Sequence, residues 1–142
     1  MVITNPLGAF GTTDLTEKFQ PVTMNFEATA DIAARTVVLI TTAAKITTAA
    51  TGTAAAGTTL GVTVDAIKAG RVGRVVVLGI VDNVPADGSI SAGSPVIAST
   101  TTAGSVIAKA APTTNEALGW AVAAASGGLV TIFVNRSVGG IT

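Results

Sequence analysis

The side chains that carry most enzyme chemistry are largely missing from this sequence. The chain contains no His, no Cys and no Tyr. Ser-His and Cys-His pairs, an imidazole base and an ordinary zinc site are therefore excluded. A Ser-Lys dyad stays formally possible, but no lysine lies in a recognisable nucleophile motif; the lysines are Lys18, Lys45, Lys68 and Lys109. We expect a protein that is not an enzyme and needs no cofactor.

Two carboxylates come close together in the stretch DNVPADG, at Asp82 and Asp87. A calcium loop needs the pattern D-x-[DN]-x-[DN]-G followed by a later Glu. The spacing here does not fit that pattern, and Pro85 interrupts it. Asp82 and the Asp87-Gly88 pair are therefore interpreted as turn residues, because Asp and Gly favour turns. No metal site is predicted.

Signals for binding phosphate or nucleic acid are also absent. No Gly-rich stretch matches G-x-x-x-x-G-K-[ST] or G-x-G-x-x-G. Arg71 and Arg74 lie in GRVGR, near an expected turn, without a surrounding basic patch. Eight acidic and eight basic residues leave no formal net charge, so the electrostatic footprint of a nucleic-acid-binding protein is missing. The two arginines are interpreted as solvated turn residues or ion-pair partners.

The composition points to assembly rather than to a membrane. The start MVITNPLGAFG lacks the basic region and the long apolar core of a signal peptide. Apolar runs such as VVVLGIV are much shorter than the ~20 residues that span a bilayer. Charged residues make up only 11% of the chain, against about 25% in typical domains. A surface with little charge and many small side chains suits close subunit contact; the alternative is a hydrophilic, Thr-rich monomer.

Two stretches of the chain are nearly alike: LGVTVDAIKAG from Leu60 and LGWAVAAASGG from Leu118. They share Leu, Gly, Val, Ala and a later Gly at matching positions, and an apolar run follows each. We interpret them as one β-hairpin unit used twice, with Val64 and Val122 facing the core. The Gly after each Leu fits a bulge or a close backbone approach. The alternative is a chance match between strands rich in Ala, Gly and Val.

The rest of the chain predicts an all-β fold, a small β-barrel or β-sandwich built of short hairpins. Residues 36–40 (TVVLI) form a candidate strand, and hairpins are expected around KAGRVG, TTAG and SGG. DNVPADGSISAGS is expected to be rich in turns. TTNEALGWAVAAAS also matches a helix, because Thr113 and Glu116 have capping-box spacing. Its repeat partner contains Val62, Thr63 and Val64, which favour a strand, so a strand is predicted there.

The first 35 residues differ from the remainder, residues 36–142, which we assign to the β-domain. They form an extended N-terminal arm and a lead-in strand, interrupted by Pro6 and Pro21. Between Phe19 and Phe26, a strand that covers the domain's own core is an equal alternative to an outward arm. The arm carries spaced apolar residues that are candidate contacts with a capsid or a neighbouring subunit: Leu7, Phe10, Leu15 and Phe19.

The ordered set LGVTVDAIKAG, VVVLGIVDNV, ISAGSPVIAS and EALGWAVAAASGGLVTIFV resembles the tailed-phage head decoration proteins, also called capsid cement proteins. The resemblance extends from FQPVTMNFEATADIAARTVVLI to GLVTIFVN. Such proteins often have a Gly-Asp turn before the first core strand, where this chain has Arg35-Thr36.

The resemblance implies a small β-barrel or β-sandwich that forms a homotrimer on the outside of the mature phage head. Such a trimer bridges neighbouring major capsid protein subunits and stabilises the shell. It implies assembly in the host cytoplasm and no nucleic acid, membrane or small-molecule substrate as a partner. The alternative is another β-sandwich module, such as a tail-tube subunit or a surface carbohydrate-binding domain. Sugar sites usually need exposed aromatics, whereas Trp120 and Phe133 are expected to be core residues.

Overall fold

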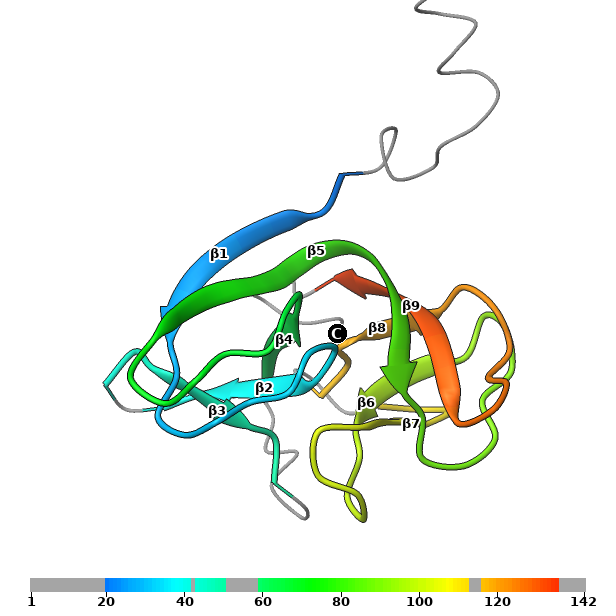
Figure 1. Ribbon diagram of the computed structural model, residues 1–142. Coiled ribbons are helices and arrows are strands. Elements are labelled where there is room, and N and C mark those ends of the chain that lie inside the picture. The colour runs from blue at the N-terminus through cyan, green and yellow to red at the C-terminus, as the bar shows by residue number, and fades with distance from the viewer. Residues whose placement is uncertain (1–19, 42, 51–58, 113–115, 136–142) are drawn as a thin grey trace, which may run out of the picture.

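The computed structural model describes residues 20–41, 43–50, 59–112 and 116–135, and these residues form one nine-stranded sheet with no helix. The sheet curls strongly, as expected for a small β-barrel, so the all-β prediction is confirmed (Figure 1). The strands are β1 (Val22–Glu27), β2 (Val37–Ile40), β3 (Ile46–Thr48), β4 (Thr59–Thr63), β5 (Val72–Pro85), β6 (Pro95–Ala98), β7 (Val106–Ala108), β8 (Gly119–Ala121) and β9 (Leu129–Asn135).

The pairing of the strands confirms the three predicted hairpins. β4 pairs with β5 across KAGRVG, β6 with β7 across TTAG, and β8 with β9 across SGG, all antiparallel. Gly119–Ala121 is therefore a strand, as the repeat predicted; residues 113–115 lie outside the described residues. The local helix signal of Ala is overridden because β8 pairs with strands on both sides.

The duplication extends far beyond the two similar stretches. In the first half, residues 22–78, strands pair in the order β1-β5-β4-β2-β3; in the second half, residues 80–135, they pair as β5-β9-β8-β6-β7. The registers match, since Val37 faces Val62 in the first half as Pro95 faces Trp120 in the second. The long strand β5 belongs to both halves and spans the molecule (Figure 1).

Each half encloses apolar side chains of its own. In the first half, Ala28 bridges Ile46 just after β1 and so brings β1 next to β3; Ala86 bridges Val106 after β5 in the same way. The smaller core cluster lies in the first half: Ala28, Ile32, Val38, Ile46, Ile67 and Val75. Their counterparts in the second half, including Ile90, Val96 and Ile132, belong to a larger cluster that also takes in residues of the first half.

The repeated glycines mark places where two backbones come very close. A β-carbon added to Gly61 would lie 2.0 Å from the carbonyl oxygen of Val76, and one added to Gly119 would lie 1.8 Å from that of Phe133. Any other residue would force these strands apart, because real β-carbons do not approach a backbone oxygen so closely. The predicted role of the glycine after Leu, a close backbone approach, is therefore confirmed at both sites.

A matching turn precedes β2 and β6. The amide of Arg35 donates to the carbonyl of Thr63 at 3.0 Å, and the amide of Gly93 donates to that of Ala121 at 2.8 Å. Arg35 has φ 58° and Gly93 has φ 82°, so both backbones are left-handed. Arg35 thus adopts the conformation for which glycine is favoured, at the place where the resembling proteins have a Gly-Asp turn.

Two details of the sequence predictions are wrong. Asp82 lies within β5 and not in a turn, because β5 continues to Pro85 with an irregularity between Val81 and Val84. Val122 is 47% exposed and does not face the core. Its counterpart Val64 is half-buried and packs against the larger core cluster. The repeat therefore predicts the wrong exposure for Val122, because the residues around this position differ between the two halves.

Candidate interaction surfaces

The four residues predicted as capsid or subunit contacts, Leu7, Phe10, Leu15 and Phe19, lie outside the described residues. The structure does describe the lead-in strand that follows them. β1 pairs with β5 along its whole length, and Phe26 packs against the smaller core cluster. Val22 and Met24 are both exposed on β1. The two alternatives for this stretch were an outward arm and a strand that covers the domain's own core. For the described part of it, the structure supports the strand.

Within the described residues, no group of acidic side chains could hold a metal ion. The same part of the chain contains no helix that is long and apolar enough to cross a membrane.

Asp82 accepts a hydrogen bond from Thr131 at 3.2 Å on the surface of the second half. Arg74 forms an ion pair with Asp65 at 3.0 Å, which confirms the ion-pair interpretation for this arginine.

An aromatic pair lies on the outside of the second half. Trp120 on β8 stacks on Phe133 of β9, with ring centroids 5.4 Å apart and an angle of 22° between the planes. Trp120 is 41% exposed and Phe133 is half-buried. The expectation that both aromatics are core residues is therefore wrong for Trp120. A signal for this was present, because Trp120 stands between the small residues Gly119 and Ala121, which alternation places on the opposite face.

The aromatic pair belongs to a row of side chains that crosses four neighbouring elements. Pro95 faces Trp120, Trp120 faces Phe133, and the amide of Lys109, just after β7, donates to the carbonyl of Pro95. None of these four residues is buried. We call them the exposed row: Lys109, Pro95, Trp120 and Phe133.

The first half has the same row in different surroundings. Val37 faces Val62, Val62 faces Val76, and the amide of Ala49 donates to the carbonyl of Val37. All four are at most 1% exposed. They belong to the cluster that contains the interior residues of the second half. We call them the buried row: Ala49, Val37, Val62 and Val76. The second half thus covers the buried row of the first half, whereas the equivalent residues of the second half, the exposed row, are not buried.

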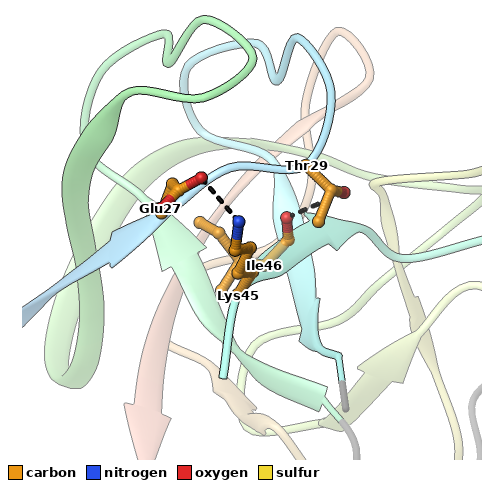
Figure 2. Close-up of polar contacts among 4 residues, drawn as sticks. All are labelled: Glu27, Thr29, Lys45 and Ile46. Carbon is orange, nitrogen blue, oxygen red and sulfur yellow. Dashed lines mark hydrogen bonds and ion pairs between the residues drawn. The ribbon is translucent and has the colours of Figure 1, made fainter. Parts of the chain in front are cut away.

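Charged side chains at two places hold strand ends together. Figure 2 shows the contact between the end of β1 and the start of β3, where Lys45 pairs with Glu27 at 2.8 Å. Next to this ion pair, the Thr29 hydroxyl and amide both donate to the carbonyl of Ile46. In the second half, Lys109 of the exposed row pairs with Glu116 at 2.7 Å. The exposed row therefore combines an apolar surface with an ion pair at one end.

Asp87 is the centre of a small polar network in the second half. The hydroxyls of Ser99 and Thr101 both donate to the same carboxylate oxygen of Asp87. These bonds, first that from Ser99, lower the pKa of Asp87 below its usual value, because they stabilise the ionised form. Gly88 follows with a left-handed backbone. The turn interpretation therefore holds for the Asp87-Gly88 pair, which fixes the loop between β6 and β7.

These features define an all-β fold made of two equivalent halves, with the exposed row on the outer surface of the second half. No protein-family model and no curated protein matches the chain. Among solved structures, the chain is similar to the crystal structure of the head fiber gp8.5 N base in bacteriophage phi29. The TM-score is 0.60 at 22% sequence identity, and the match covers 85% of this chain and 98% of that chain. The two proteins share a fold over nearly the whole of the fiber base.

Proposed function

We propose that this protein is a structural component of a phage head. The observation that carries the proposal is the fold, which is shared with a base of a phage head fiber over 85% of the chain. The sequence motifs that resemble head decoration proteins point to the same class independently. The sequence adds that His, Cys and Tyr are absent, which suits a protein whose role involves no catalytic step.

In its more specific form, the proposal is a decoration protein that forms a homotrimer on the outer surface of the head. It bridges neighbouring major capsid protein subunits and so stabilises the shell. A protein that binds only the assembled lattice stabilises it by RT ln(1 + [L]/Kd). A trimer holds several capsid subunits at once, so individually weak contacts add through effective concentration. The arm residues Leu7, Phe10, Leu15 and Phe19 are the proposed contacts.

The test is co-sedimentation of the purified chain with matured heads and with unassembled major capsid protein of the same phage. We expect saturable binding to heads only, together with a higher temperature of head disruption when the chain is bound. Native mass spectrometry of the free chain should give the mass of three copies. Failure to bind heads, or equal binding to unassembled capsid protein, contradicts the decoration role.

One observation favours carbohydrate binding as a second candidate function. Trp120 is exposed and stacks on Phe133, and exposed aromatic faces on a folded body suit stacking on sugar rings. Titration of the chain with host cell-surface oligosaccharides, followed through the emission of Trp120, tests this candidate. A saturable change that Trp120→Ala abolishes supports it, and the absence of any change with all sugars excludes it.

A further inference from the structure

The buried row and the exposed row occupy equivalent positions in the duplicated fold but differ in solvent exposure. In the first half, Val37 and Val62 are fully buried, while in the second half Pro95 is half-buried and Trp120 is exposed. Two halves packed face to face would bury both rows equally. The contact between the halves is therefore head-to-tail: a surface of the second half covers the buried row, and among the described residues the matching surface of the first half covers no equivalent row.

One residue shows how the second half reaches the buried row. Gly104, in the loop between β6 and β7, accepts a hydrogen bond from the amide of Val37 and donates one to the carbonyl of Ala49, both at 2.9 Å. Gly104 also lies close to two threonine side chains. A β-carbon on Gly104 would be 2.8 Å from the methyl carbon of Thr36 and 3.1 Å from that of Thr48. The β6–β7 loop thus joins the edge of the first half at the buried row.

The first half carries an equivalent loop between β2 and β3. Ala44 precedes Lys45 there as Gly104 precedes Ser105, and both backbones are left-handed, with φ 58° and 78°. The end of this loop is fixed by the ion pair between Lys45 and Glu27 (Figure 2). The first half therefore presents, at residues 43–45, the end of a shorter loop at the place equivalent to the loop that covers a row in the second half.

We propose that the exposed row is covered by residues 43–45, at the end of the β2–β3 loop, of a second copy of this chain. The inference rests on the self-association in the proposed function and names the surfaces that meet. The same head-to-tail relation that joins the two halves then joins two chains. A heterologous contact of this kind closes into a ring when its rotation allows, which fits a cyclic homo-oligomer.

The contact between chains differs from the contact within the chain at several positions, and Ala44 in the place of Gly104 is one of them. Pro95 occupies the place of Val37 and has no amide hydrogen, so the bond that Val37 donates to Gly104 has no counterpart. The carbonyl of Lys109, which corresponds to that of Ala49, can still accept from the incoming loop. The aromatic pair Trp120 and Phe133 supplies apolar area in place of the lost bond. Trp is among the residues that most often dominate binding at interfaces.

The test uses the full chain and its single tryptophan. Oligomer mass is measured by sedimentation over a concentration series, while the emission of Trp120 is recorded in parallel. We expect the emission to move to shorter wavelength as the oligomer forms, because the indole leaves water. Trp120→Ser and Val122→Glu, both at exposed positions, should weaken association at least tenfold. Met24→Ser is the matched control, since Met24 is 51% exposed on β1 and belongs neither to the exposed row nor to the β2–β3 loop.

Each other outcome overturns a different statement. If the chain forms an oligomer whose stability and emission do not depend on Trp120, the exposed row is not the subunit contact, although the self-association stands. If the chain stays monomeric at all concentrations and on heads, both the inference and the homotrimer are wrong. If the chain stays monomeric and the emission changes only on binding heads, or only with oligosaccharides, another partner covers the exposed row and the inference is wrong. The role on phage heads is then decided by the co-sedimentation experiment.

Discussion

Gly61 and Val76 lie so close across β4 and β5 that a β-carbon on Gly61 would be 2.0 Å from the carbonyl oxygen of Val76. Because the obstacle is backbone, relief requires two paired strands to separate. Gly61→Ala and Gly119→Ala should each lower the free energy of unfolding by roughly 3 kcal/mol or more. Urea unfolding of the two variants measures this.

Gly88→Ala is the matched control for the two glycine variants. Gly88 has φ +89° but open space around it, so the cost comes from the backbone conformation alone and should be about 1–2 kcal/mol. Equal losses at Gly61, Gly119 and Gly88 would show that the close approach of the strands does not decide stability.

Val64 and Val122 occupy the same place in the two halves but have different surroundings. Val64 packs against the larger core cluster, whereas Val122 is 47% exposed. Val64→Ser should therefore destabilise the chain by about 1–2 kcal/mol, and Val122→Ser by no more than about 0.5 kcal/mol. Thermal unfolding at a concentration where the chain is monomeric compares them. A larger loss at Val122 would contradict the structural assignment of its face.

Asp87 should make the stability of the chain depend on pH. Its pKa is lowered in the folded state by the hydroxyls of Ser99 and Thr101. The stabilisation from the ionised carboxylate is therefore present above the ordinary pKa of Asp and is lost as the pH falls through the lower folded pKa. Asp87→Asn should have a lower Tm than the unmodified chain at pH 7, and the gap should close in acid.

A scan of Tm against pH for both chains tests the role of Asp87. Thr101→Val, which removes one of the two hydroxyl donors, should give a gap of intermediate size with the same pH dependence. A gap between Asp87→Asn and the unmodified chain that stays constant from neutral to acidic pH would show that the charge of Asp87 contributes nothing.

The N-terminal arm is predicted to dock on capsid protein or on a neighbouring subunit, with Phe10 as the outermost anchor. Deletion of residues 1–14 should leave the Tm of the β-domain nearly unchanged and weaken binding to heads measurably. The reason is that Pro6, Gly8 and Gly11 keep this segment from folding alone, so its apolar residues need a partner. Unfolding of the truncated domain, with full binding by the folded fraction, would place the arm in the protein's own core instead.

Local patterns in the sequence predicted much of the fold. The three hairpins and the strand at Gly119–Ala121 follow from period-two alternation, Gly-containing turns and the Leu-Gly repeat. The close approach at Gly61 and Gly119 was also predictable, because a glycine inside a strand signals that another backbone is near. These features depend on neighbours in sequence or in one hairpin, and their physical causes act over short distances.

The sequence could not determine which outer faces are covered. Val62 and Trp120 stand at equivalent positions, yet one is buried and the other is 41% exposed, because the second half packs on the row that contains Val62, whereas none of the described residues covers Trp120 in the same way. The repeat places Val122 in the core through its match to Val64, and Trp120 is expected there as an aromatic of the β-domain, but neither pattern shows which outer face is covered. The sequence by itself determined the strands and their hairpins, since backbone sterics and alternation are local. Only the tertiary structure decided the continuation of β5 through Asp82, the extent of the duplication and the exposed row, because these depend on contacts between distant segments.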